Sequence, residues 1–142
     1  MQEISLTLST ATDRSKTLIK TAADTIRMFV SSLTNATSDE ADNIRMCAYE
    51  AVANSFTYAY PGEVGCVKVH CHVDRYANVV VQVTDYGKGF SEDLWQTACG
   101  TGFAVMQSLS KKCEVWSTPG DKTIVRLRFK VSEGIKVDSH SK

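Results

Sequence analysis

Alternation of apolar and polar residues in the second half of the chain constrains the fold more than any other feature. Between residues 67 and 74 every second side chain is apolar, and residues 79–84 and 125–131 are also predicted to be alternating strands. Because successive side chains of a strand point to opposite faces of a sheet, such strands bury one face and expose the other. A shorter strand is predicted at residues 113–117, with Val115 directed inward and Trp116 outward. We therefore expect a sheet that is covered on one face only.

The first half of the chain predicts the helices that cover this sheet. Residues 3–9 alternate like the later strands, but residues 12–33 repeat their apolar side chains with the period of an amphipathic helix. A second helix is expected to begin at the capping box Thr37-x-x-Glu40 and to end near residues 58–60, before Pro61-Gly62. The predicted fold class is α/β (or α+β), a two-layer sandwich with a mixed, mainly antiparallel sheet and helices on one face.

Length, charge and cysteine content narrow the class of protein. The 142 residues suffice for one domain with a hydrophobic core, which we assign to residues 1–131, and residues 132–142 are predicted to be a disordered tail. The formal net charge is zero, and no apolar run approaches the ~20 residues of a membrane-spanning helix. Five cysteines without a C-x-x-C pair indicate reduced thiols. We expect a cytoplasmic protein that binds neither nucleic acid directly nor a membrane.

The motif Asp85-x-Gly87-x-Gly89 follows the valine-rich strand predicted at residues 79–84. At this point a carboxylate can accept a hydrogen bond from the exocyclic amine of a base, and glycines let the backbone approach a flat ring. The same pattern also fits an ordinary turn after a strand. Its interpretation as a ligand site therefore depends on the rest of the chain.

Two further motifs complete a candidate ligand site. Gly100-x-Gly102 leads into a predicted helix, whose free N–H groups and positive dipole end suit a phosphate. Glu50 and Asn54 lie four residues apart on the second predicted helix and therefore share one flank. The chain has no G-x-x-x-x-G-K-[ST] phosphate loop, and Gly100-x-Gly102 lacks the third glycine of a dinucleotide fingerprint.

In order and spacing, these motifs resemble the three nucleotide boxes of the Bergerat, or GHKL, ATP-binding fold. Over residues 1–131 the chain is similar to the small bacterial anti-sigma factor/serine-protein kinases. The resemblance implies an ATP-binding anti-sigma regulatory protein that phosphorylates a serine or threonine of a small antagonist protein and sequesters a sigma factor (partner switching). It also implies ATP and Mg²⁺ as cofactors, Mg²⁺–ATP-dependent serine/threonine kinase activity, and a homodimer. Trp116 and Ile124, which the strand pattern directs outward, are candidate contacts of such a dimer.

The resemblance implies a role for each matching residue as well. Glu50 corresponds to the catalytic general base, and Asn54 corresponds to the residue that holds Mg²⁺ on the phosphates. Asp85 would bind the adenine amine, and Thr123 would assist it through water. The implied nucleotide-binding set is Asn54, Asp85, Gly87, Gly89, Gly100, Thr101, Gly102, Phe103 and Thr123.

The chain departs from the family pattern in the segment between the second and third boxes. Residues 91–99 are a short version of this lid and contain no Lys or Arg, whereas a transferring phosphoryl group is normally met by cations. Lys88 and Lys122 are candidate substitutes, and Tyr58 stands where many relatives carry His. A second hypothesis is therefore a non-catalytic or weakly catalytic nucleotide-binding module that acts only through protein–protein binding. A histidine-kinase catalytic domain is a third, although none of the three histidines lies on a predicted helix.

Overall fold

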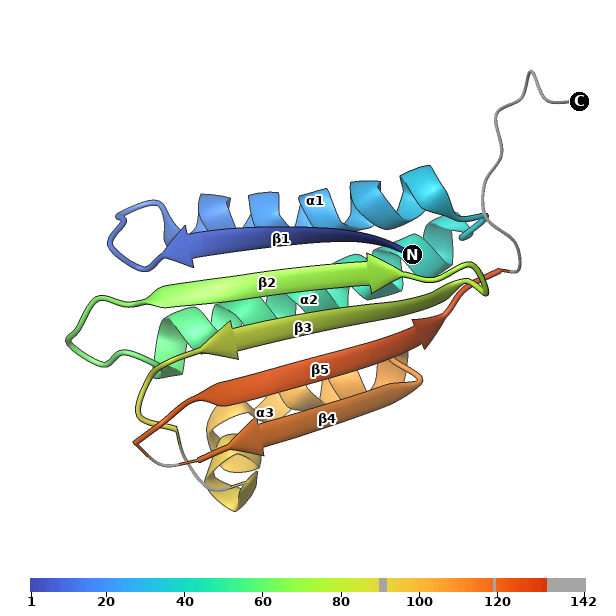
Figure 1. Cartoon of the computed structure of the whole chain (residues 1–142). Helices are drawn as coiled ribbons and strands as arrows, with labels where there is room; N and C mark the ends of the chain where they lie inside the picture. Colours follow the sequence, from blue (N-terminus) through green and yellow to red (C-terminus); the bar gives the residue numbers. More distant parts are fainter. Residues whose placement is uncertain (90–91, 119, 133–142) are drawn as a thin grey trace, which may run out of the picture.

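The computed structural model describes residues 1–89, 92–118 and 120–132, so Phe90 and all of the predicted tail 132–142 except Ser132 lie outside the described residues. Five strands and three helices follow one another along the chain (Figure 1). Their bounds are β1 (Gln2–Ser9), α1 (Ser15–Leu33), α2 (Ser38–Tyr58), β2 (Cys66–Val73), β3 (Asn78–Asp85), α3 (Glu92–Leu109), β4 (Lys112–Ser117) and β5 (Thr123–Lys130).

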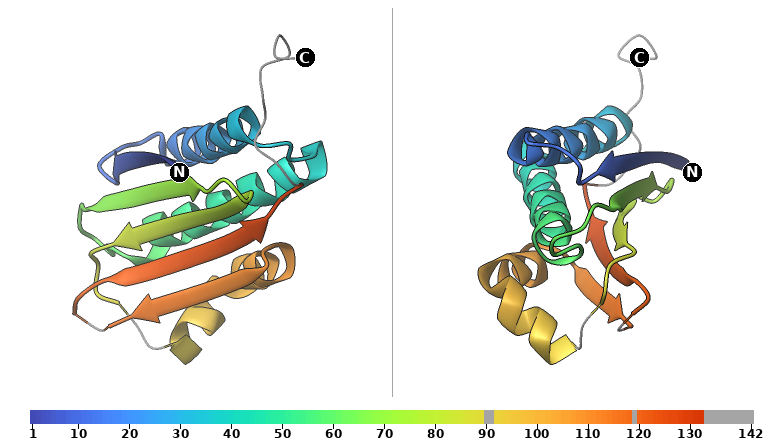
Figure 2. Two further views of the ribbon diagram at one scale, coloured as in Figure 1. Left: turned by 45° about the vertical axis from the view of Figure 1, so that its right-hand side comes forward. Right: turned by 90° about the vertical axis from the view of Figure 1, so that its left-hand side faces the viewer.

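The strands form one open sheet in the order β1-β2-β3-β5-β4. All four neighbouring pairs are antiparallel, so the expectation of a mainly antiparallel sheet is confirmed, while the described strands contain no parallel pair. The helix α3 carries the chain from β3 to the outer strand β4, and β5 then returns between them, antiparallel to both. The helices lie on one face of the sheet, and the side view shows the two predicted layers (Figures 1 and 2).

The core lies between the sheet and the helices. The inward residues of β2, which are Val67, Val69, Cys71 and Val73, are at most 2% exposed, as the alternation predicts. On the helical side the apolar stripe of α1 and the small residues of α2 are buried against them. Among the described residues no helix combines the length and the apolar character needed to cross a membrane.

Helix α2 begins where the capping box predicts. The Thr37 hydroxyl accepts a hydrogen bond from the Glu40 N–H at 3.1 Å, and the Glu40 carboxylate accepts one from the Thr37 N–H at 2.8 Å. These two bonds satisfy donors that a helix start leaves free. At its other end α2 stops at Tyr58, before Pro61. The helix that carries Glu50 and Asn54 is thus anchored at a defined start.

Helix α3 differs from the prediction. A helix was predicted only after Gly100-x-Gly102, but the backbone is already helical from Glu92, within the segment compared to the lid. Gly100 interrupts the helix with φ 46° and ψ −116°, a left-handed backbone that glycine adopts without steric cost. The glycine therefore separates two helical segments (Figure 2). As predicted, the glycine motif precedes a helical segment, although another helical segment comes before it.

Candidate functional site

Asp85 ends strand β3 and is 5% exposed. Its two carboxylate oxygens accept hydrogen bonds from different donors, the Ser55 hydroxyl at 3.1 Å and the Gly87 N–H at 3.1 Å. Burial raises the pKa of Asp85, while these two hydrogen bonds act in the opposite direction. The carboxylate is thus held in one orientation, and each oxygen retains a lone pair for a further donor.

Thr123, at the start of β5, lies directly opposite Asp85 in the β3–β5 pairing. Its side chain is 4% exposed, and its hydroxyl lies 2.7 Å from that of Ser117 on β4. Although the two residues are far apart in the sequence, the antiparallel pairing of β3 and β5 places them side by side. The structure therefore brings together Asp85 and Thr123, as the resemblance implies.

The two glycines after Asp85 are sites of close backbone approach. A Cβ on Gly87 would lie 2.0 Å from the carbonyl oxygen of Ala59, beyond the end of α2. Gly89 has a φ of +64°, and a Cβ there would lie 2.4 Å from the carbonyl oxygen of Thr118. Both positions therefore require glycine for the packing of the loop that follows Asp85.

The Gly100-x-Gly102 motif lies against the flank of α2 that carries Glu50 and Asn54. A Cβ on Gly102 would lie 2.6 Å from Glu50 Oε2 and 3.6 Å from Asn54 Nδ2, so α3 touches the flank of α2 at these two residues. The Nδ2 atom of Asn54 is buried without a hydrogen-bond partner among the described residues. A buried polar atom of this kind costs free energy unless a ligand or water satisfies it. As a donor, Nδ2 would meet an acceptor such as a phosphate oxygen, whereas Mg²⁺ would be held by the Asn54 amide oxygen, a type of ligand that the metal accepts.

The remaining residues of the third box have different environments. Gly100 has open space around the position of a Cβ, and Thr101 is exposed at the start of the second helical segment. The Phe103 side chain is 9% exposed and belongs to the hydrophobic core. A contact between Phe103 and a nucleotide would therefore involve its backbone.

The residues around the Asp85 carboxylate, which form the base end of the candidate nucleotide site, enclose little free space. A pocket of about 10 Å³ lies between α2 and the ends of β3 and β5. Ligand pockets usually measure about 300–1,000 Å³, so an adenine ring would have to displace part of the wall. The pocket is lined by Ala51, Asn54, Ser55, Tyr58, Ala59, Asp85, Thr123 and Val125.

Sequence reasoning missed two residues of this region. Ser55 received no role from the sequence, but its hydroxyl donates to the buried Asp85 carboxylate. Tyr60 was treated as the end of a helix, but its hydroxyl donates to the Cys66 carbonyl at 2.7 Å and accepts from the Tyr86 N–H at 2.8 Å. It therefore ties the Asp85 loop to the start of β2.

The two candidate cations are exposed. Lys88 lies in the loop after β3 and Lys122 in the turn between β4 and β5, and within the described part of the chain neither forms an ion pair. The lining of the small pocket includes neither side chain. Their proposed contact with phosphates stays a prediction.

The chain matches a known protein family over most of its length. The profile of the histidine kinase-like ATPase domain matches residues 15–129. The chain is 30% identical to the anti-sigma F factor of Caldanaerobacter subterraneus subsp. tengcongensis over 125 residues, which is 80% of this chain and 86% of that protein. It is also 30% identical to the anti-sigma F factor of Clostridium acetobutylicum over 122 residues, 77% of this chain and 84% of that protein.

Solved structures agree on the fold. The histidine kinase domain of the blue-light activated histidine kinase from Erythrobacter litoralis superimposes with a TM-score of 0.61 and 19% sequence identity. The match covers 82% of this chain but 61% of that one, so the chain spans less than two thirds of the solved kinase domain. At this identity the likeness concerns the fold alone. The chain therefore belongs to the histidine kinase-like ATPase domain family and, within it, groups with the anti-sigma F factors.

Proposed function

We propose that the protein is an ATP-binding anti-sigma regulator that transfers the γ-phosphoryl group of Mg²⁺–ATP to a serine or threonine of a small antagonist protein, and that it also binds a sigma factor. Membership of the family supports ATP binding and the anti-sigma role. The observation that carries the enzymatic part is the close approach of Gly102 to Glu50 and Asn54. It puts a glycine motif of the kind that can bind phosphate beside a carboxylate and an amide.

Helix α2 would align the two ends of the nucleotide. Ser55 holds the Asp85 carboxylate at the base end, while Glu50 and Asn54 lie on the neighbouring flank beside Gly102. An adenine amine at Asp85 would leave the phosphates directed toward Gly102. Mg²⁺ held by Asn54 would neutralise charge on the phosphates.

Glu50 would act as the general base. Its carboxylate takes the proton of the acceptor hydroxyl, and the resulting oxygen forms a bond to the γ-phosphorus. The bond between that phosphorus and the oxygen bridging to the β-phosphate breaks, and ADP leaves with the electron pair. Glu50 is only partly buried, which suits a base that has to reach a side chain of another protein.

A phosphotransfer assay tests this proposal. The wild type is incubated with γ-labelled ATP, Mg²⁺ and a purified antagonist protein of the partner-switching type, next to the Glu50→Gln variant. Label should appear on the antagonist with the wild type and fall by about a hundredfold or more in Glu50→Gln, while ATP binding persists. Equal labelling by both proteins would contradict the role of Glu50.

A non-catalytic binding module is the second candidate, because the pocket beside Asp85 holds only about 10 Å³ and residues 91–99 contain no cation. In that case the wild type would bind a sigma factor but would not label any antagonist. The same assay, supplemented by a pull-down with the sigma factor, separates the two functions.

A further inference from the structure

A second pocket lies at the end of the sheet opposite to the candidate nucleotide site. The start of α2, the end of α3 and the end of β5 meet there (Figure 1). The pocket measures about 300 Å³, which is at the lower end of the usual range of ligand pockets. It shares no lining residue with the small pocket beside Asp85, so it has no part in holding a nucleotide.

The lining of this pocket is mainly apolar, with a free charge beside it. Ile44 of α2, Phe129 of β5 and the adjoining Val131 are at most 6% exposed. Leu109, the last residue of α3, is only partly buried there. Lys111 also lines the pocket, and this exposed side chain forms no ion pair with any residue that the structure describes. The pocket therefore suits an aliphatic side chain from a segment that also carries a carboxylate.

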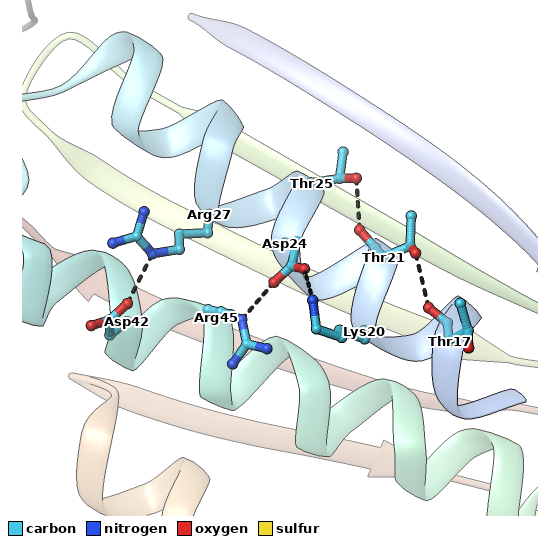
Figure 3. A network of polar contacts seen from close by, with 8 residues as sticks. All are labelled: Thr17, Lys20, Thr21, Asp24, Thr25, Arg27, Asp42 and Arg45. Carbon is cyan, nitrogen blue, oxygen red and sulfur yellow. Dashed lines mark hydrogen bonds and ion pairs between the residues drawn. The ribbon is translucent and has the colours of Figure 1, made fainter.

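The α2 wall of the pocket is held in place without a ligand. Arg27 Nε of α1 lies 2.9 Å from Asp42 Oδ1, and Asp42 directly precedes the lining residue Asn43 (Figure 3). Three residues further along α2, Arg45 Nε lies 2.6 Å from Asp24 Oδ1 of α1 (Figure 3). The pocket is therefore a feature of the packed helices and forms without an occupant.

The described part of the chain ends at this pocket. The Ser132 N–H and hydroxyl both donate to Oε1 of the lining residue Glu40, at 3.2 and 2.8 Å. The same oxygen accepts the Thr37 N–H of the capping box. One residue before Ser132, the Val131 N–H donates to the Ala77 carbonyl at 3.1 Å. The point from which the rest of the chain continues is thus fixed beside the pocket.

The residues that follow Ser132 supply the side chains that this pocket suits. Glu133 is acidic and complements Lys111 by charge, while Gly134 lets the backbone reverse its direction. Ile135 is a branched aliphatic residue. Three extended residues span about 10 Å at most, so Ile135 stays within reach of the pocket.

We propose that this pocket is the docking site of the chain's own C-terminal segment, residues 133–136, with Ile135 seated against Leu109. Docking ties the start of α2 to the end of α3, the two helices whose flanks meet at Gly102. The inference does not rest on nucleotide binding or on phosphoryl transfer.

Backbone relaxation of the full chain, measured by NMR, tests this inference. A docked segment gives the Ile135 amide an order parameter near that of a rigid backbone, about 0.85, whereas a flexible segment gives less than about 0.6. We expect the first value at Ile135 and the second at Ser141, the control near the chain end. The value at Ile135 should not change on dilution, because the segment and the pocket belong to the same chain.

Ile135→Ser should release the segment and lower the melting temperature by about 4 °C, because an aliphatic side chain loses its contacts in the pocket. Val64→Ser is the matched control. Val64 is 68% exposed and lies outside the pocket, so its substitution should change the melting temperature by less than about 1 °C. In a Leu109→Ala background Ile135→Ser should cost less than half as much, because the contact partner is already truncated.

Three results would overturn the inference: an order parameter below about 0.6 at Ile135, an Ile135→Ser variant that melts as the wild type does, or the same melting shift with and without the Leu109 side chain. An order parameter that falls on dilution would overturn it as well, because it would assign the pocket to the segment of a second copy of the chain.

Discussion

At one end of the site the Asp85 carboxylate already has two hydrogen-bond donors, whereas at the other end the Asn54 amide nitrogen is buried without a partner among the described residues. The base end is built from strand ends and a loop that pack backbone against backbone. The transfer end is built from the side chains of Glu50 and Asn54 beside Gly102. The first end is complete without a ligand, and the second is arranged to be completed by one.

This comparison predicts that substitutions at the base end lower stability as well as nucleotide binding, while those at the transfer end impair metal binding or phosphoryl transfer without lowering stability. The effects on the free energy of unfolding should decrease in the order Gly87, the pair Ser55 and Asn54, Gly102 and Asp85.

The largest effect is expected for Gly87→Ala. The added Cβ would lie 2.0 Å from the Ala59 carbonyl oxygen, and backbone cannot yield as a side chain does, so we expect a loss of about 3 kcal/mol. Chemical denaturation measures it. Gly62→Ala is the control, since φ is +72° there but nothing lies within 4 Å of the Cβ position; its expected cost is about 1 kcal/mol. Equal losses in the two variants would mean that the close approach at Gly87 is unimportant.

The neighbours Ser55 and Asn54 on α2 should respond with opposite signs. Ser55→Ala removes a donor from a buried carboxylate and should cost about 1–2 kcal/mol. Asn54→Ala removes an unsatisfied buried amide and adds a better helix former, so the free protein should gain up to about 1 kcal/mol. Thermal unfolding of both variants without nucleotide checks the signs. Destabilisation by Asn54→Ala would show that its amide has a partner in the free protein.

Gly102→Ala should hardly change stability but should impair phosphoryl transfer. Its Cβ would approach the end of the flexible Glu50 side chain at 2.6 Å, which can move, and alanine favours the helix by up to about 1 kcal/mol. A displaced Glu50 should lower the transfer rate by about a hundredfold. Denaturation and the phosphotransfer assay, run on the same sample, measure the two effects. A large loss of stability would indicate that the contact between α2 and α3 is rigid, like the one at Gly87.

The weakest effect is expected in the pH dependence of stability. Because the pKa of Asp85 is raised in the folded protein, the folded state holds this proton more tightly than the unfolded state. The free energy of unfolding should therefore fall as the pH rises from the usual aspartate pKa through the raised value. Asp85→Asn should remove this part of the slope, as measured by denaturation at a series of pH values. An unchanged slope would contradict the shift.

Much of the fold followed from local patterns. The alternation of β2 and the capping box at Thr37 predicted elements that depend on neighbours in the chain, and the structure contains them. The helical segment before Gly100 was missed, because a glycine pair was taken as the start of the helix. Ser55 was missed because its partner, Asp85, is distant in the sequence.

The residues of the candidate site could be proposed from the sequence, but their arrangement could not. The three motifs fall in the expected order, and the contact of Gly102 with Glu50 places two of them together. The narrow pocket beside Asp85 depends on how α2 packs against the ends of β3 and β5. Such packing brings together residues that are distant in the sequence, so no local pattern predicts it.

The central claim is that one nucleotide bridges the two ends of the site, and calorimetric titration of ATP with and without Mg²⁺ tests it most directly. The wild type should bind ATP, and binding should strengthen with Mg²⁺. Asp85→Asn should lose about 2 kcal/mol, roughly thirtyfold in affinity, and Asn54→Ala should lose the effect of Mg²⁺. A wild type that does not bind ATP, or an Asp85→Asn variant that binds as the wild type does, would contradict the account.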